Sequence, residues 1–283
     1  MILFKANYFK KGFKTILLLL IIISSKSYSQ EHALDFKLKQ AFKKSKDTIY
    51  VSFTPTLLSS SDKIRKIKDF DNLDFNIQEE FKKKYQPIIS NTNDSIILSI
   101  YKNKLLSSLK DYGFVVIEVN FDTVFTSYTQ NTHRMNIVQL ELEEVNYTDT
   151  LKDEKTNLKF TKELTGVYFN TWVRYNQEDS LSQLLFFNNS SYLPFMQGSI
   201  IKKDNKNVAE YTLNEATPNT FYNLSKENAI QTAQYYFNFL MNKHVFEQGK
   251  EKDKKYYYSI DPYTKTIYFD ETPFDLFEII EEP

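Results

Sequence analysis

Two long amphipathic helical patterns, at residues 94–111 and 225–246, are separated by runs of strand-like sequence. In both patterns apolar residues recur every three to four positions, so that one face of each helix can be buried. The helices do not alternate regularly with single strands, as they would in a parallel doubly wound sheet. We therefore predict an α+β fold with a mainly antiparallel sheet, on which the helices Asp94–Asp111 and Ser225–Phe246 pack.

The strand-like segments alternate apolar and polar residues or are rich in β-branched residues. They are Thr48–Thr54, Phe114–Val119, Asn136–Val145, Val167–Tyr175, Leu184–Asn188, Gly198–Lys202, Tyr256–Ile260 and Thr266–Phe269. The fourth, fifth and sixth of these predict consecutive antiparallel strands. The last two flank a turn sequence that contains proline and aspartate, which predicts a hairpin.

The first 29 residues have the order of a secretory signal peptide. Four lysines precede the eight-residue apolar run Ile16–Ile23, and small residues lead to Ser29. Such a run forms a helix of roughly 12 Å, which is too short for a hydrocarbon core of about 30 Å. We expect cleavage near Ser29, no transmembrane span afterwards, and export to the periplasm or outer membrane of a Gram-negative bacterium, or secretion.

The mature region, residues 30–283, is long enough to bury a core without disulfides or metals. The chain contains no cysteine, which excludes a disulfide scaffold, a thiol nucleophile and a thiolate metal site. No cysteine is present to accept a lipid, so we predict no lipid anchor. A charged run at residues 151–161 is the candidate seam between two subdomains, 47–150 and 162–283.

Charge and glycine content exclude several classes of protein. The chain has 36 basic and 36 acidic residues, and the predicted signal holds five lysines and no acid, so the mature region is mildly acidic. Nucleic-acid binding needs a clustered basic face, and we expect none. Only five glycines are present, which excludes a phosphate-cradling loop, a dinucleotide fingerprint and a nucleophile elbow. We expect no cofactor.

Carboxylates and histidines are the remaining candidates for chemistry. Glu141 and Glu143 would project from one strand face about 7 Å apart, within the range of paired glycosidase carboxylates, although such glutamates are also ordinary on a wet strand. His133 is expected in a polar loop and His244 near a helix C-terminus, where a structural role also fits. The acidic segment 69–74 lacks the pattern of an EF-hand. We predict no catalytic residue and no metal site.

Aromatic residues provide the candidate binding surfaces. Trp172 and Tyr168, on one strand, could form a platform for a sugar or a peptide, or could pack within a half-buried sheet. The acidic C-terminal tail carries Phe274, Phe277 and Ile280, whose exposure is costly unless they dock. The tail could dock on its own domain or on a partner. These five residues are our candidate binding residues.

The segments Ser99–Val119 and Ile137–Glu144 together resemble a known type of envelope module. An amphipathic helix ends in Gly-Phe, enters an apolar strand, and is followed by a strand that alternates apolar and acidic residues. This pattern is similar to the small α+β modules of Gram-negative periplasmic accessory proteins, such as LptE and the LpoB and CsgG-type lipoproteins. The resemblance implies a non-enzymatic role in building or regulating the envelope, with envelope proteins as partners.

These observations favour an exported, non-catalytic binding or assembly factor of the cell envelope. Two alternatives stay open. One is a hydrolase that acts on envelope glycan with carboxylates alone, since two acids suffice for glycoside cleavage. The other is a carbohydrate-binding or adhesion module.

Overall fold

The computed structural model describes residues 47–120, 132–153, 156–176, 183–214, 216–247 and 257–270. All of them belong to one compact unit that spans residues 47–283. Helices and strands are both prominent in it, which confirms the α+β class. The predicted signal peptide and the C-terminal tail lie outside the described residues.

The main sheet is mixed, so the prediction of a mainly antiparallel sheet is wrong. Its order is β3-β1-β4-β5-β6, and β2 also pairs with β4. The strands are β1 (Thr48–Phe53), β2 (Leu57–Ser61), β3 (Val115–Glu118), β4 (Thr132–Lys152), β5 (Lys159–Asn176) and β6 (Gln183–Tyr192). β1 is parallel to both β3 and β4, and β2 is parallel to β4, whereas β5 is antiparallel to β4 and β6.

The parallel part of the sheet arises from a helical crossover. After β2 the chain forms α2 (Asp62–Arg65), α3 (Phe75–Tyr85) and α4 (Asp94–Asp111), and it then returns as β3 beside β1. Strands joined by a tight turn must be antiparallel, while a long crossover connection allows them to be parallel. The sequence predicts α4 and the strand after it, but not that β1 and β3 pair.

A bulge in β4 keeps its apolar residues on one face of the sheet. Ile137 pairs with Val173 of β5, but the next pair is Gln139 with Trp172, so β4 holds one extra residue. A bulge of this kind reverses the alternation of side chains between the two faces. The fully buried residues of β4 accordingly change from odd to even numbers: Met135, Ile137, Leu140 and Leu142.

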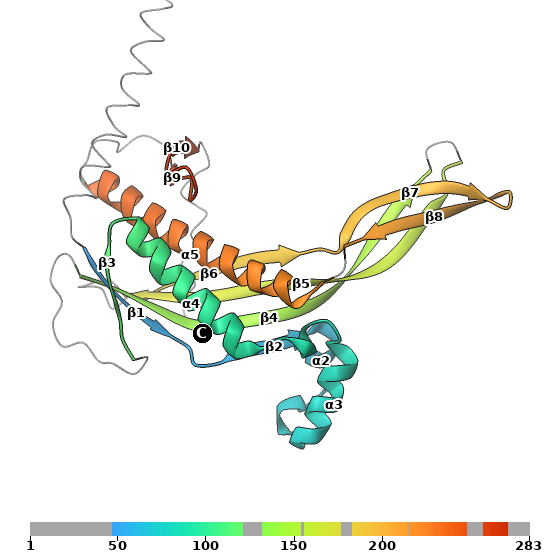
Figure 1. Ribbon diagram of the computed structural model, residues 1–283, viewed down its shortest axis with the longest axis horizontal. Helices are drawn as coiled ribbons and strands as arrows, with labels where there is room; N and C mark the ends of the chain where they lie inside the picture. The colour runs from blue at the N-terminus through green and yellow to red at the C-terminus, as the bar shows by residue number, and fades with distance from the viewer. Residues whose placement is uncertain are drawn as a thin grey trace, which may run out of the picture. The chain divides into compact units, whose positions relative to one another are not determined.

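The two long helices pack against each other and cover the same face of the sheet (Figure 1). The bounds of α4 agree with the prediction, and Asn93 caps it by accepting the N–H of Ile96. α5 (Pro218–Glu247) begins earlier than the predicted first residue, Ser225, which is buried and donates to the carbonyl of Ile97. No helix in the described part of the chain combines the length and apolar character needed to cross a membrane.

Two hairpins complete the unit. β7 (Phe195–Lys203) pairs with β8 (Lys206–Leu213) in a separate sheet, so the predicted pairing of residues 198–202 with residues 184–188 is wrong. β9 (Tyr257–Ile260) and β10 (Ile267–Asp270) form the hairpin that the sequence predicts. The candidate seam lies where β4 and β5 meet, and a division into two subdomains stays a prediction.

Candidate functional site

Alternate residues of the main sheet point away from α4 and α5, and we call this side the open face. On β5, Phe169 stacks on a tyrosine of α4 and Thr171 donates to an asparagine of α5. The side chains of Tyr168, Asn170 and Trp172 therefore point to the open face. Their cross-strand neighbours lie on it too: Glu143, Glu141 and Gln139 on β4, and Ser191, Asn189 and Phe187 on β6.

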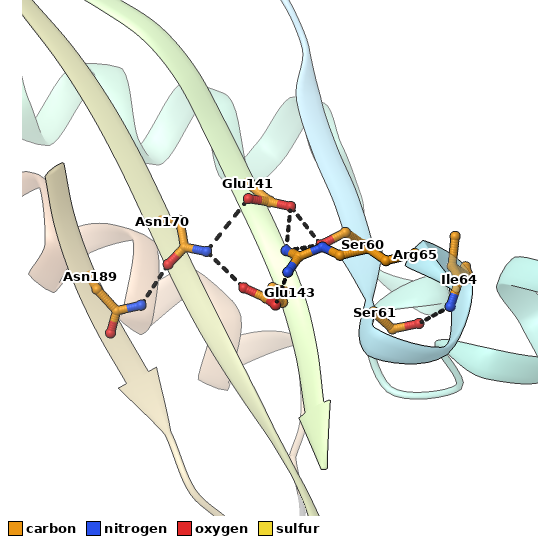
Figure 2. A network of polar contacts seen from close by, with 8 residues as sticks. All are labelled: Ser60, Ser61, Ile64, Arg65, Glu141, Glu143, Asn170 and Asn189. Carbon is orange, nitrogen blue, oxygen red and sulfur yellow. Dashed lines mark hydrogen bonds and ion pairs between the residues drawn. The ribbon is translucent and has the colours of Figure 1, made fainter. Parts of the chain in front are cut away.

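Glu141 and Glu143 belong to a polar cluster that extends from α2 to β6 (Figure 2). Nη1 of Arg65 lies 2.8 Å from Oε1 of Glu143, and Nη2 lies 3.3 Å from Oε1 of Glu141. Nδ2 of Asn170 donates to Oε2 of Glu143 at 3.0 Å and to Oε2 of Glu141 at 3.5 Å. Oγ of Ser60 donates to Oε1 of Glu141 at 2.5 Å. Each of the four carboxylate oxygens thus has a partner.

Arg65 forms ion pairs with both glutamates at the solvent-exposed boundary of the cluster. Glu141 and Glu143 are 9% and 8% exposed, whereas the side chain of Arg65 is 50% exposed. Burial lowers the pKa of Arg65, but the negative charge and hydrogen bonds of Glu143, followed by those of Glu141, outweigh it and raise this pKa above its ordinary value. The guanidinium therefore stays charged, and it covers the two glutamates from the solvent side.

Local structure on both sides orients this cluster. Ser61 caps α2 by accepting the N–H of Ile64 at 3.2 Å, which places Arg65 in the first turn after β2. On the other side, Nδ2 of Asn189 donates to Oδ1 of Asn170 at 2.5 Å, so the amide group of Asn170 must turn its donor toward the glutamates (Figure 2). The polar side chains of the cluster are held by one another before any ligand arrives.

An aromatic pair lies beside the polar cluster on the open face. The ring centroids of Trp172 and Phe187 are 4.6 Å apart, and their planes are tilted by 48°. The two residues are cross-strand partners, and Phe187 remains 48% exposed. Tyr168 lies on the same face, but Asn170 separates it from Trp172, so the two predicted aromatic residues do not form a single platform.

The histidines are placed differently from the sequence-based expectation. His133 lies in β4 and not in a loop, with Nδ1 3.1 Å from the hydroxyl of Tyr175 and Nε2 3.5 Å from Oδ2 of Asp47. Burial, followed by the neighbouring Tyr175 and Asp47, raises the pKa of Tyr236 in this cluster well above its ordinary value. These residues pack on the helix-covered face, away from the open face. His244 lies in α5, and its side chain is not described.

The other predicted residues do not add to the open face. Phe274, Phe277 and Ile280 lie outside the described residues. In the described part of the chain, no group of three or more histidine, aspartate or glutamate side chains could hold a metal ion.

A separate hollow of about 540 Å³ lies between the segment before α4, the first half of β5 and the start of α5. Apolar side chains such as Ile88, Leu164 and Phe221 line it together with Lys162 and Asn214. The polar cluster and the aromatic pair are not part of this lining. The hollow therefore offers space, but not the carboxylate pair that a glycan hydrolase would use.

Sequence reasoning identified Glu141, Glu143 and Trp172 but missed Arg65, Asn170 and Phe187. Arg65 is one of three arginines in the chain, which could have singled it out as a partner for adjacent glutamates. Nothing local in the sequence indicates that Asn170 and Phe187 become neighbours of the glutamates and of Trp172, because that depends on strand register.

Comparison of the chain with protein-family models gives no match, and comparison with curated proteins gives no match either. The resemblance to periplasmic accessory proteins therefore stays a prediction. The open face, with its polar cluster and aromatic pair, is the feature of the described residues from which we infer a function.

Proposed function

We propose that this protein is an exported, non-catalytic binding or assembly factor of the cell envelope, and that it contacts a protein partner through the open face. The proposed location, in the periplasm or at the outer membrane of a Gram-negative bacterium, rests on the signal-like order of the first 29 residues. The proposed mode of action rests on the aromatic pair and the polar cluster of the open face.

The aromatic pair is the observation that carries this proposal. Tryptophan and other large aromatic residues are enriched at the energetic centre of protein interfaces, where polar neighbours surround them. Trp172 and Phe187 have this arrangement, because Asn170 and Asn189 lie beside them on the same strands and Arg65 lies beyond. The hydrogen bonds of the polar cluster hold these neighbours in place, so little side-chain entropy is lost on binding.

The polar cluster supports a non-catalytic role over the hydrolase alternative. A glycosidase needs one carboxylic acid that protonates the leaving group and one carboxylate that faces the sugar. In this protein both glutamates are buried beneath Arg65, and each of their oxygens already accepts a hydrogen bond or an ion pair. Arg65 contacts Oε1 of each glutamate and Asn170 contacts Oε2 of each, so a substrate would have to displace an existing partner to bind either carboxyl group.

The tilt of the aromatic pair favours a protein partner over a sugar. The two rings are 4.6 Å apart and inclined by 48°, so they do not form one continuous flat surface across which a sugar ring could stack. Apolar side chains of a protein partner can contact the pair without a flat surface. A carbohydrate-binding module remains the second candidate, because amide side chains flank the pair.

Site-specific photo-crosslinking in the native host tests the proposal. A photoreactive phenylalanine analogue replaces Phe187 on the open face or, as the control, Tyr235, an exposed aromatic residue of α5. We expect a discrete crosslink to an envelope protein from position 187 and none from position 235. Trp172→Ala should reduce the crosslink at least about tenfold, as expected for an interface centre, while the thermal midpoint shows that the variant still folds.

Three results would contradict the proposal. They are equal crosslinking from both positions, no loss of the crosslink in Trp172→Ala, and hydrolysis of an envelope glycan that disappears in Glu141→Gln. The last result would establish the hydrolase alternative.

The predicted docking of Phe274, Phe277 and Ile280 needs its own experiment. If the tail docks on its own domain, deletion of residues 272–283 should lower the thermal midpoint. If it docks on a partner, the deletion should leave the midpoint unchanged and abolish co-purification of the protein that position 187 crosslinks.

A further inference from the structure

The ends of the β4–β5 and β7–β8 hairpins lie at the same end of the unit (Figure 1). The β7–β8 hairpin packs on the distal parts of β4 and β5: Nδ2 of Asn207 donates to Oδ2 of Asp153 at 2.9 Å, and the hydroxyl of Tyr211 donates to the carbonyl of Phe160 at 3.4 Å. Nζ of Lys162 lies 5.0 Å from the ring centroid of Tyr211. The two hairpin ends therefore form one surface.

The last cross-strand pair before the turn of each hairpin consists of two lysines. Lys152 of β4 pairs directly with Lys159 of β5, and Lys203 of β7 pairs directly with Lys206 of β8. All four are exposed, and Lys202 lies next to them. We call these five residues the lysine tip. Like charges directly opposite each other destabilise an antiparallel pair, so both terminal pairs retain a repulsion that an anion would relieve.

The nearby acidic residues offset the charge of the lysine tip only in part. Oδ2 of Asp153 accepts the hydrogen bonds of Asn207 and of Thr156, which fix the carboxylate in the turn and leave its single negative charge. Asp204 lies in the two-residue turn between Lys203 and Lys206, where it adopts a positive φ of 48°. Among the described residues of the two hairpin ends, five lysines thus face two aspartates.

An exposed leucine accompanies these charges. Leu158 immediately precedes Lys159 and is 50% exposed, and its carbonyl accepts the N–H of Asp153, which orders the backbone at the end of the hairpin. An apolar side chain flanked by lysines is the arrangement that suits a membrane interface, because lysines bind lipid phosphates while the apolar group enters the boundary of the acyl chains. A soluble polyanion would use the lysines but gain nothing from the leucine.

We propose that the lysine tip, together with Leu158, binds the surface of a bilayer that contains anionic lipids. This contact uses residues distinct from those of the open face. The protein would then hold a membrane surface at one end of its sheet and a protein partner on the open face. Loss of either contact should leave the other intact.

A dye placed at the tip reports on this contact directly. Because the chain has no cysteine, Thr156→Cys in residues 30–283, without the predicted signal, gives a single attachment site for an environment-sensitive fluorophore. Ser90→Cys, exposed in the segment before α4, is the control site. The probes are vesicles of phosphatidylcholine with and without phosphatidylglycerol. We expect a blue shift at position 156 with the anionic vesicles only, and no shift at position 90.

Matched charge variants test the role of the lysines. Replacing Lys152, Lys159, Lys203 and Lys206 by Gln should weaken vesicle binding at least about a hundredfold at low salt, since each lysine near an anionic surface contributes roughly fivefold. The control replaces the same number of exposed lysines elsewhere by Gln: Lys66, Lys68, Lys83 and Lys84. This control should change the affinity less than about threefold. If the fourfold tip variant does not fold, the pair Lys203→Gln and Lys206→Gln replaces it, with a smaller expected loss.

Four results would overturn the proposal. They are an equal shift with neutral vesicles, equal losses in the two fourfold variants, no weakening in Leu158→Ser, and a shift with soluble polyphosphate that matches the shift with anionic vesicles. The last result would assign the tip to a polyanion in solution.

Discussion

The side-chain amide of Asn242 in α5 binds both backbone polar groups of Tyr258 in β9. Its Nδ2 donates to the carbonyl of Tyr258 at 2.7 Å, and its Oδ1 accepts the N–H of Tyr258 at 2.7 Å. A neighbouring strand would normally supply these two bonds. The amide of Asn242 thus takes the place of a strand at this edge of β9.

Side-chain amides one turn and two turns earlier in α5 also take the place of a neighbouring strand. Oδ1 of Asn238 accepts the N–H of Ile260 at 3.0 Å, and Nε2 of Gln234 donates to the carbonyl of Ile260 at 2.7 Å. Residues four apart lie on one helix face, and residues two apart in a strand direct their backbone groups to one side. Asn242 therefore reaches Tyr258, and Asn238 and Gln234 both reach Ile260, two residues further along β9. These hydrogen bonds attach the β9–β10 hairpin to α5.

We expect Asn242→Leu to lower the free energy of unfolding by about 2–4 kcal/mol, because two buried backbone groups of Tyr258 lose their partners. Urea denaturation measures this change. Asn223→Ala, at an exposed position of the same helix, should change the free energy of unfolding by less than about 0.5 kcal/mol. Equal effects of the two variants would show that the amide of Asn242 is dispensable.

Arg65→Met should destabilise the fold by about 1–3 kcal/mol. It leaves Glu141 and Glu143 buried side by side without their cation, and the half-exposed position of Arg65 moderates the loss. Adding Glu143→Gln should recover part of that loss, since one of the two negative charges is removed. Lys66→Met, the adjacent exposed position, is the control. A double variant that is no more stable than Arg65→Met would contradict the assigned charge balance.

Glu144→Gln should make stability less dependent on pH. Burial raises the pKa of Glu144 above its ordinary value of 4.5, although the N–H groups of Ile89 and Ile88 oppose this shift by donating to Oε1. A carboxyl group with a raised folded-state pKa stabilises the protein most below its ordinary pKa, and this contribution is lost as pH rises through the folded-state pKa.

The stability of the Gln variant relative to the natural protein should therefore rise between about pH 4 and pH 7. The glutamine oxygen can still accept both N–H groups, whereas Glu144→Ala should cost about 1–3 kcal/mol at every pH. Urea denaturation across this pH range measures the difference. Glu210→Gln, an exposed glutamate of β8, should show no such trend.

Gly166→Ala should destabilise the sheet by about 1–3 kcal/mol. A Cβ at this position would lie 2.8 Å from Cδ2 of Leu193 and 3.0 Å from the carbonyl oxygen of Tyr192. The β5–β6 pairing holds Tyr192 in place, so its carbonyl cannot move away easily.

Gly198→Ala provides the matched comparison for Gly166→Ala. There the nearest atoms are the end of the Leu151 side chain, at 2.7 Å. A flexible side chain can shift, so the loss measured by thermal denaturation should be smaller, and Leu151→Ala should relieve part of it. A larger loss for Gly198→Ala than for Gly166→Ala would contradict this reading.

Local sequence patterns predicted most helices and strands of the described region. α4 has the predicted bounds because its capping residue, its apolar face and the glycine after it all lie within about 20 residues. β2 and β8 were missed, because β2 follows a proline closely and β8 is largely exposed, so neither carries a strong apolar pattern. The mixed sheet was missed because the β1–β3 pairing joins residues far apart in the chain.

In the candidate site, too, local patterns predicted some features and long-range strand pairing decided the others. The alternation in β4 predicted that Glu141 and Glu143 share a face, and the β5 pattern predicted that Tyr168 and Trp172 do so as well. Strand register then decided that Asn170 separates those two aromatic residues and that Phe187 pairs with Trp172.

The sequence by itself determined the α+β class and which residues of a strand share a face, whereas burial of Glu141 and Glu143 on the face predicted to be wet came from the tertiary structure. The class and the shared faces follow from interactions between residues close in the chain and from hydrophobic periodicity. Only the tertiary structure decided that Arg65 contacts Glu141, 76 residues away in the chain, together with Glu143, and that the amides of α5 pair with β9. Such contacts depend on how separate elements meet, and no local pattern specifies which polar groups will face each other when they do.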